Sequence, residues 1–359
     1  MNNQELMSYD DIYVKSNDLT QVDGPTVIAL AHNEMYFLPA WLDHYRKLGA
    51  ERFIILDDAS TDSTLDYLRA QPDVMVVGSH RRFGETVPVI DRLDPTGQTV
   101  EMRRMVDLWR MILPEKFTLN CWVVQAALDE FLVLPNGRKL ADIFDELSTS
   151  EYDAVTGTML DIYPANIGVM RAQQMQTTVS FSDEWFFDGV PHRLPTGLHF
   201  RKVYHGSRAR LFHQFLPETA MTFHERLRER LSRWYHREGP YRKVNNTQKF
   251  SLVRWRSGTW MRSSHNISLP ISKQHHLPIL HMKFTGDLYR RAEVAIRSKS
   301  YYNSSKEYTQ LIELISEMER RDASFLFPKS ASIHNIVAFQ SARLILGFDD
   351  NTRQPSHEN

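Results

Sequence analysis

The chain has 359 residues, with 43 Lys and Arg against 44 Asp and Glu. This length allows two domains, or one large α/β domain with an extension, and it is sufficient to bury a sizeable core. The balanced charge gives no indication of a nucleic-acid partner, and the single cysteine, Cys121, excludes an intramolecular disulfide and is typical of a reducing compartment.

The N-terminal segment 1–23 is polar and lacks the apolar core of a signal peptide. No apolar run is long enough to cross a membrane, so we expect a soluble, cytoplasmic protein. The β-rich run 26–31 predicts a buried first strand. Apolar residues at helical spacing over 37–48 then predict a helix, and Gly49 is typical of its C-terminal end.

Two further strands are predicted at 52–56 and 74–77, with a helix between them that begins after the Ser- and Thr-rich run 59–64. Strands that alternate with helices at this spacing predict a parallel sheet with crossover helices. In such sheets, ligands bind beyond the carboxyl ends of the strands. The polar side chains expected at that edge are Asn33, Glu34, Asp57 and Asp58.

The stretch from Trp122 to Pro135 contains two apolar runs separated by Asp129 and Glu130. Short apolar runs are typical of buried strands, and carboxylates at the end of a buried strand are costly to desolvate unless they meet a cation. The two carboxylates should therefore reach the same edge of the sheet as the first group. The alternative is a solvated turn between two strands.

The second half of the chain contains another apolar run at 154–160, which ends at Asp161. The basic segment 218–242 interleaves arginines with apolar residues at helical spacing, which suits a helix at an anionic membrane surface or a helix docked on the protein; we favour docking. A packed helix is predicted over 333–348, followed by a polar, disordered tail, 349–359.

Three motifs in this order resemble the family-2-like glycosyltransferases: Ala31-His32-Asn33-Glu34, the run from Asp57 to Thr64, and Leu128-Asp129-Glu130-Phe131-Leu132. Runs at 249–253, 263–265, 281–284 and 301–308 extend the resemblance, which covers residues 25 to 315. It implies an α/β fold of the glycosyltransferase A type, Rossmann-like, with a mostly parallel central sheet flanked by helices. The catalytic domain would span 24–290, and a helical C-terminal extension would span 291–348.

One position departs from the motif. The family carries Asp-x-Asp-Glu-Phe, and its first Asp falls on Ala127, whereas Asp129 matches the second. An alanine side chain cannot coordinate a cation, so half of the motif's chemistry is missing. Either the loss is natural and leaves weak or metal-independent transfer, or it is a deliberate Asp-to-Ala change that traps a substrate complex. We favour the second explanation, because the other motifs are intact.

The resemblance implies that a nucleotide-diphospho-sugar, UDP-linked, donates a sugar to a saccharide or lipid-linked acceptor in bacterial surface-polysaccharide synthesis. A lipid-linked acceptor would favour peripheral contact with the inner face of the membrane. A divalent cation, Mn²⁺ or Mg²⁺, would stabilise the leaving diphosphate. Its implied ligands are Asp129, His265 and His281. The residues implied to bind the nucleotide-sugar are Ala31, Asn33, Glu34, Asp57, Asp58, Arg104 (or its neighbour Arg103) and Lys283.

Transfer with inversion also needs a base within hydrogen-bond reach of the acceptor hydroxyl. We expect Asp161 in this role. Asp183, Glu184 and Asp188 are rivals, and they flank the aromatic residues 185–187. Such an aromatic cluster is more often part of the core than a platform that stacks on a sugar. Glu130 would orient the site or bond to the backbone. A non-catalytic sugar-nucleotide or glycan-binding module is the alternative function. A nucleotidyltransferase is disfavoured because no Gly-rich phosphate loop follows the first strand.

Overall fold

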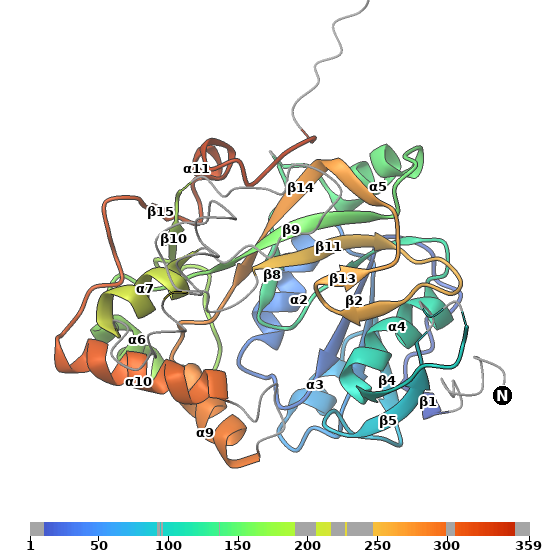
Figure 1. The fold of residues 1–359 in the computed structure, drawn as a ribbon, viewed down its shortest axis with the longest axis horizontal. Helices are drawn as coiled ribbons and strands as arrows, with labels where there is room; N and C mark the ends of the chain where they lie inside the picture. The colour runs from blue at the N-terminus through green and yellow to red at the C-terminus, as the bar shows by residue number, and fades with distance from the viewer. Residues whose placement is uncertain are drawn as a thin grey trace, which may run out of the picture.

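The computed structural model describes residues 11–91, 94, 96–135, 137–190, 206–216, 227, 247–298 and 306–348. The main sheet contains β1 (Ile12–Ser16), β2 (Thr26–Ala31), β3 (Arg52–Asp57), β4 (Val74–Ser79), β7 (Trp122–Gln125), β8 (Glu130–Leu132), β9 (Ala154–Asp161), β11 (Gln248–Arg254) and β14 (Ile271–His281). These nine strands lie in the order β1-β4-β3-β2-β7-β11-β9-β14-β8 (Figure 1).

The pairing of the strands makes the sheet mixed, with a parallel core. Strands β2, β3, β4, β7, β9 and β14 run in one direction, whereas β1, β11 and β8 run in the other. The prediction of an α/β fold with a mostly parallel central sheet is confirmed at this level. The three strands predicted in the first part of the chain are also confirmed, as β2, β3 and β4.

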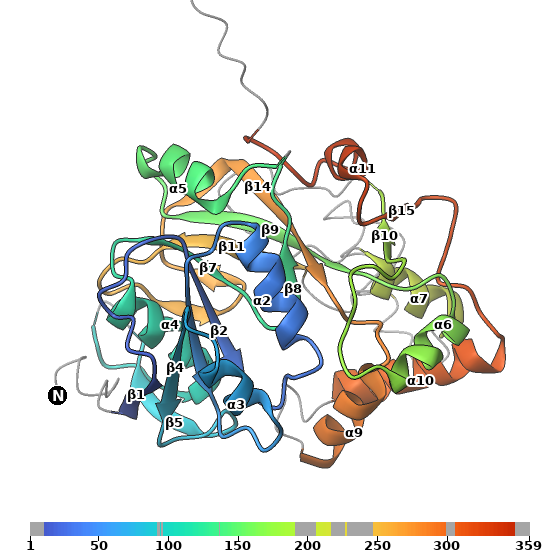
Figure 2. The ribbon, with the colours of Figure 1, turned by 180° about the vertical axis from the view of Figure 1, so that it is seen from behind.

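Side chains on the two faces of the sheet enter separate apolar clusters. In β3, Phe53 and Ile55 belong to one cluster, and Ile54 and Leu56 belong to the other, because successive side chains of a strand point to opposite faces. The first face is covered by α2 (Leu38–Lys47), α3 (Thr64–Arg69) and α5 (Leu140–Ser148), and the second by α4 (Met105–Phe117). Helix α4 lies in front of the sheet in Figure 1, and α2 lies in front in Figure 2.

Helix α2 confirms the helix predicted over 37–48. Leu38, Trp41, Leu42 and Tyr45 are its buried residues, and Pro39 lies in the first turn, where its missing N–H costs no hydrogen bond. Gly49 follows the helix with φ +89°, a conformation that glycine adopts without strain.

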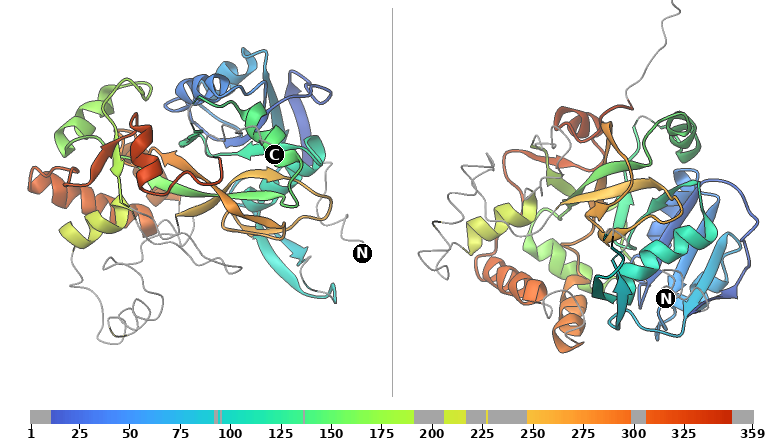
Figure 3. Two further views of the ribbon diagram at one scale, coloured as in Figure 1. Left: turned by 90° about the horizontal axis from the view of Figure 1, so that it is seen from above. Right: turned by 45° about the vertical axis from the view of Figure 1, so that its right-hand side comes forward.

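A third apolar cluster joins helices that lie beyond the end of the sheet. It contains residues from α6 (Ile167–Ala172), α7 (Ser207–Phe215), α9 (Leu288–Ser298) and α10 (Lys306–Arg320). In the left view of Figure 3, the yellow and orange helices lie on the opposite side of the molecule from the blue strands. The loop that leads from β14 into α9 connects this cluster to the sheet.

The helix predicted over 333–348 is wrong in its length. Helix α11 covers only Ile336–Ser341, and Arg343 and Gly347 then take positive φ angles of 54° and 76°. Left-handed residues end a helix, so the later apolar residues are buried by an irregular segment. Leu344, Ile345 and Phe348 are these buried residues.

Short strand pairs complete the described part of the chain: β5 (Thr86–Ile90) with β6 (Val100–Arg104), β12 (Met261–Ser263) with β13 (Asn266–Ile267), and β10 (Phe186–Asp188) with β15 (Ser330–Ser332). In the aromatic loop, Trp185 and Phe187 are fully buried, which confirms that they are core residues. Apart from Leu227, the basic segment 218–242 lies outside the described residues, and so does the tail 349–359. Within the described chain, every helix is too short or too polar to cross a membrane.

Candidate functional site

A cavity of about 420 Å³ opens at the carboxyl ends of the parallel strands. Residues that follow β2, β3, β7 and β14 line it, together with the first residues of β11, which runs in the opposite direction and therefore begins at the same edge. Of the predicted site residues, those in its wall are Ala31, Glu34, Asp58, Ala127, Asp129, His281 and Lys283. The expectation that the acidic groups after β3 and β7 face one crevice is thus confirmed for Asp58 and Asp129.

The two acids after β3 have different surroundings. Asp58 is 7% exposed, and its Oδ2 accepts a hydrogen bond from the backbone N–H of Phe83 at 3.2 Å. Its Oδ1 is buried without a hydrogen-bond partner among the described residues, and Arg82 Nη1 lies 3.7 Å from it. A buried oxygen of this kind is costly unless a ligand or water donates to it. Asp58 therefore presents an acceptor in the cavity wall.

Asp57 does not line this cavity. It forms an ion pair with Lys15 of β1 at 2.7 Å and accepts from the backbone N–H of Ser60 at 3.1 Å. Burial opposes ionisation of Asp57, but the bonds from Lys15 and Ser60 outweigh it and lower its pKa. Its contacts are those of a residue that fixes β1 and the start of the next loop.

Asn33 ties two loops together beside the cavity. Its side-chain oxygen accepts from the backbone N–H groups of Thr61 at 2.7 Å and Asp62 at 3.2 Å, and its φ of 57° is one that asparagine tolerates. Asn33 lines a second hollow of about 490 Å³, which also contains Asp287 and Arg290, and not the main cavity.

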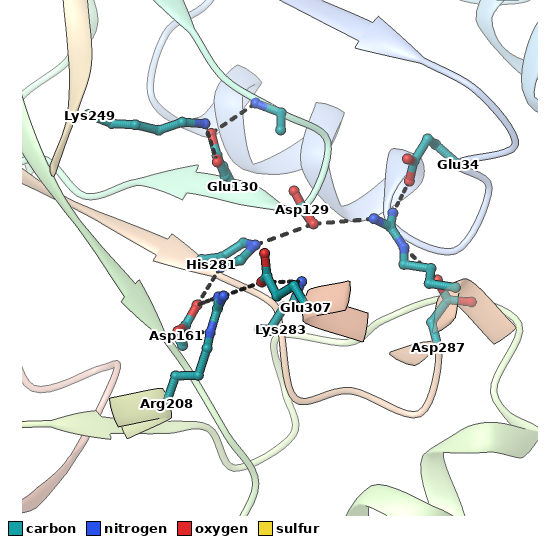
Figure 4. Close-up of polar contacts among 12 residues, drawn as sticks. Glu34, Asp129, Glu130, Asp161, Arg208, Lys249, His281, Lys283, Asp287 and Glu307 are labelled. Atoms are coloured by element: carbon teal, nitrogen blue, oxygen red, sulfur yellow. Dashed lines mark hydrogen bonds and ion pairs between the residues drawn. The ribbon is translucent and has the colours of Figure 1, made fainter. Parts of the chain in front are cut away.

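Three neighbouring strands place Glu130, His281 and Asp161 in one row, because His281 is the register partner of both acids. His281 Nδ1 lies 2.5 Å from Asp161 Oδ1, and its Nε2 lies 3.5 Å from Asp129 Oδ2 (Figure 4). Burial would lower the pKa of His281, but the two aspartates outweigh that effect and raise it. His281 therefore links the cavity carboxylate Asp129 to the buried Asp161.

Asp161 is held on both oxygens. Arg208 donates to them from Nε at 2.8 Å and from Nη2 at 2.7 Å, and both side chains are 3% exposed. Burial opposes ionisation, but Arg208 and His281 lower the pKa of Asp161. The network continues from Arg208 to Glu307, and Lys283 lies 3.6 Å from Glu307. Asp161, the predicted base, adjoins the site through His281 and does not line the cavity.

Glu130 lies behind the cavity wall. It forms an ion pair with Lys249, and its Oε2 accepts from the backbone N–H of Ala127 at 3.0 Å. The carbonyl of Ala127 accepts from Trp41 Nε1 at 2.9 Å. These two bonds fix the turn between β7 and β8 through its backbone. Of the two roles expected for Glu130, its contact with the backbone of Ala127 matches the second, a bond to the backbone.

The two predicted arginines also point elsewhere. Arg104 precedes α4 and pairs with Asp107 at 3.4 Å, and Arg103 donates to the carbonyl of Met261 and lies over the ring of Trp260. Neither lines the cavity, whereas Arg110, on the next turns of α4, does. Which of these arginines reaches the cavity depends on contacts with elements far along the chain, and the local sequence does not show those contacts.

Sequence reasoning missed the most connected cation of the site, Arg291 on α9. It contacts Glu34, Asp129 at 3.2 Å and Asp287 at 2.9 Å, and its guanidinium lies over the ring of Phe37 at 4.6 Å. Burial would lower the pKa of Arg291, but the three carboxylates raise it well above its ordinary value. Burial raises the pKa of Glu34 to about 7, against the opposing charge of Arg291.

The described residues contain no ready set of three ligands for a divalent cation. Within the described part of the chain, no group of three His, Cys, Asp or Glu is arranged to hold a metal ion. His265 Nδ1 bonds to the carbonyl of Gln248, and His265 does not line the cavity. Asp129 and His281 are the remaining implied ligands. Asp129 meets Arg291 at 3.2 Å, and His281 Nδ1 is bonded to Asp161 while its Nε2 lies 3.5 Å from Asp129. A hard cation requires several oxygen ligands, whereas these two residues supply one carboxylate and one imidazole nitrogen.

Among the charged residues of the cavity wall, basic side chains outnumber acidic ones. Five basic residues line it, Arg82, Arg110, Lys249, Lys283 and Arg291, against three acidic ones, Glu34, Asp58 and Asp129. Such a wall attracts an anionic ligand. Comparison of the chain with protein-family models gave no match, and neither did comparison with curated proteins.

Proposed function

We propose that this protein is a glycosyltransferase that moves a sugar from a nucleotide-diphospho-sugar, UDP-linked, to a saccharide or lipid-linked saccharide in bacterial surface-polysaccharide assembly. The ordered motifs in the sequence support the family, the donor and the pathway. The cavity supports the proposal through its position, its volume and its charge. Its 420 Å³ falls within the range of small-molecule sites, and it lies where α/β sheets bind their ligands.

The observation that carries the proposal is the presence of Asp58 and several basic side chains in the wall of one cavity. The Oδ1 of Asp58 accepts no hydrogen bond from the described residues and lies 3.7 Å from Arg82 Nη1, so it is suited to accept from a ribose hydroxyl or a base N–H. Lys283 and Arg291 are suited to the diphosphate. A nucleoside diphosphate needs a hydrogen-bond acceptor for its nucleoside and cations for its phosphates in the same cavity.

In the proposed reaction, the oxygen of an acceptor hydroxyl bonds to the anomeric carbon while the bond from that carbon to the diphosphate breaks. The electron pair of the broken bond stays on the phosphate oxygen, and the hydroxyl proton passes to a base. Cations fixed near that oxygen stabilise the charge that develops on it. Arg208 and His281 hold both oxygens of Asp161. We therefore propose that Asp161 does not act as the base and instead orients His281 and, through it, Asp129.

The rival function is a non-catalytic module that binds a sugar nucleotide or a glycan. Ala127 favours it, because an alanine replaces an acid of the motif. The two functions share the nucleotide site and differ in turnover. Prolonged incubation with UDP-sugars, followed by measurement of released UDP, separates them: release supports the enzyme, and tight binding without release supports the module.

Calorimetric titration of the full chain with UDP, GDP and CMP tests the nucleotide site. We expect UDP to bind and Asp58→Ala to weaken its binding by about ten- to a hundredfold, the effect of losing a hydrogen bond to a charged group. Asp66→Ala is the matched control, since Asp66 is an exposed aspartate on α3 that is absent from the cavity wall. Equal affinity in wild type and Asp58→Ala, or no nucleotide binding at all, would contradict the proposal.

A further inference from the structure

Arg291 lies where three segments distant in sequence converge. Its Nη2 contacts Glu34 from the β2–α2 loop, its Nη1 contacts Asp129 from the β7–β8 turn, and its Nε contacts Asp287 one helical turn earlier. Figure 4 shows these three acids arranged around one guanidinium, and a further dashed line joins Asp129 to His281. The Arg291 side chain is 18% exposed, and it lines the cavity.

Ala127 lies on the same wall, and its backbone is fully used. Its N–H donates to Glu130 and its carbonyl accepts from Trp41, so the turn keeps its shape without a side-chain ligand at this position. The carboxylate that the motif would supply here is absent, and the carboxylate that remains, Asp129, faces a guanidinium.

We infer that the guanidinium of Arg291 takes the diphosphate of the nucleotide in place of a divalent cation, so that nucleotide binding by this chain is independent of metal. The inference rests on the proposed function and names the residue that reads the diphosphate. It adopts the natural explanation for Ala127. A guanidinium suits this task because it keeps its charge at every relevant pH and offers paired N–H donors to phosphate oxygens.

The contacts of Arg291 leave donors for a ligand. Arginine has five N–H groups, and the three acids accept from one hydrogen on each nitrogen, so Nη1 and Nη2 each keep a second hydrogen with no acceptor among the described residues. The three acids and the ring of Phe37 fix the plane of the guanidinium. Lys283, whose ammonium lies 4.5 Å from the ring of Tyr308, adds a second cation to the same wall.

The test is calorimetric titration of the full chain with UDP and with uridine, in EDTA and in MnCl₂. We expect the dissociation constant for UDP to differ by less than about twofold between the two buffers. Arg291→Gln should weaken UDP binding by about ten- to a hundredfold, the effect of losing hydrogen bonds to a charged group, and leave uridine binding nearly unchanged. Arg291→Lys keeps the positive charge and loses the paired N–H donors, so its affinity for UDP should lie between those of wild type and Arg291→Gln.

Arg290→Gln is the matched control. Arg290 is the preceding residue, also pairs with Asp287, is 49% exposed and lines the second hollow instead. Its change should leave UDP affinity within about twofold of wild type. Circular dichroism establishes whether each variant is folded. If Arg291→Gln does not fold, Arg291→Lys still tests the inference.

The outcomes are separable. UDP binding that disappears in EDTA and returns with Mn²⁺ overturns the inference and leaves the proposed function standing. The same holds if Arg291→Gln and Arg291→Lys both bind UDP as wild type does. Failure of uridine and of every nucleoside diphosphate to bind overturns the proposed function itself, and this inference with it.

Discussion

Single buried residues outside the cavity set how the fold responds to pH. His44 of α2 lies under β8, where its Nε2 bonds to the carbonyl of Leu132 at 2.8 Å. Burial lowers the pKa of His44 from 6.5 to about 4. The unfolded chain therefore takes up a proton that the folded chain rejects, so this stabilisation is present above pH 6.5 and is lost as the pH falls toward 4.

We expect His44 to cost the fold about 2 kcal/mol of unfolding free energy between pH 7.5 and pH 5, at about 1.4 kcal/mol per pH unit below the unfolded pKa. Urea unfolding at the two pH values measures the loss. His44→Gln keeps a donor for Leu132 and does not titrate, so its loss should be smaller than that of wild type by this amount. Equal losses in the two proteins would show that His44 is not the source.

The buried pair of Asp161 and Arg208 provides a second prediction at this scale. Asp161→Asn leaves the charge of Arg208, 3% exposed, with one fewer partner, and breaking a buried ion pair costs about 3–5 kcal/mol. The double variant Asp161→Asn/Arg208→Gln should recover at least about 1 kcal/mol of that loss, because the uncompensated charge is removed. The surface pair Arg297 and Glu293, 78% and 59% exposed, is the control, and its disruption should change stability little.

At the scale of elements, Gly286 sets how closely the loop before α9 approaches the short helix η2 (Gln173–Met175). A Cβ at Gly286 would lie 2.3 Å from the backbone carbon of Gln173 and 2.4 Å from the nitrogen of Gln174. Backbone atoms cannot rotate away as a side chain can, so the loop itself must move. Helix α9 carries Arg291, and the displacement would therefore reach the cavity.

Gly286→Ala should lower the free energy of unfolding by about 1–3 kcal/mol, the usual cost of overpacking, and should also weaken UDP binding. Chemical denaturation and calorimetry measure the two effects. Gly168→Ala in α6 is the control, since a Cβ there meets only the side-chain oxygen of Asn166, at 3.2 Å. Unchanged UDP affinity in a destabilised Gly286→Ala would separate the position of α9 from ligand binding.

The elements that sequence reasoning identified are those whose apolar pattern is complete within the element. Strands β2, β3 and β4 are buried along nearly their whole length, and their residues show it. Strand β1 was missed because it is an edge strand in a polar segment, with Tyr13 and Val14 exposed. Its place depends on β4, to which it pairs, and no local pattern contains that information.

The residues of the candidate site that could be predicted are likewise those with a local signal in the sequence. Asp58 and Asp129 were predicted to share a crevice because each follows a strand, and position after a strand is visible in sequence. Arg291 was not predicted to belong to the site. Its spacing from Asp287 is that of an ordinary exposed helix pair, and its other partners, Asp129 and Glu34, are 162 and 257 residues away. Long-range pairing therefore decides which charged residues belong to the site.

At the scale of the whole molecule, the residues of the cavity wall come from most of the length of the described chain, from Ile28 to Tyr308. A ligand there should stabilise the entire fold. UDP at a hundred times its dissociation constant should raise the free energy of unfolding by about 2.7 kcal/mol. At the same UDP concentration, a tenfold weaker Asp58→Ala should gain about 1.4 kcal/mol. Thermal and urea unfolding measure both, and an equal rise in the two proteins would mean that UDP acts elsewhere.

The place of β14 has a consequence for synthesis of the protein on the ribosome. This strand lies between β9 and β8, although both precede it in the chain by more than a hundred residues. Until residues 271–281 leave the exit tunnel, β8 and one edge of β9 lack their partner strand, and unpaired strands are prone to pair with other chains. A polypeptide halted before that point has neither His281 nor Arg291, so the cavity wall is completed only near the end of translation.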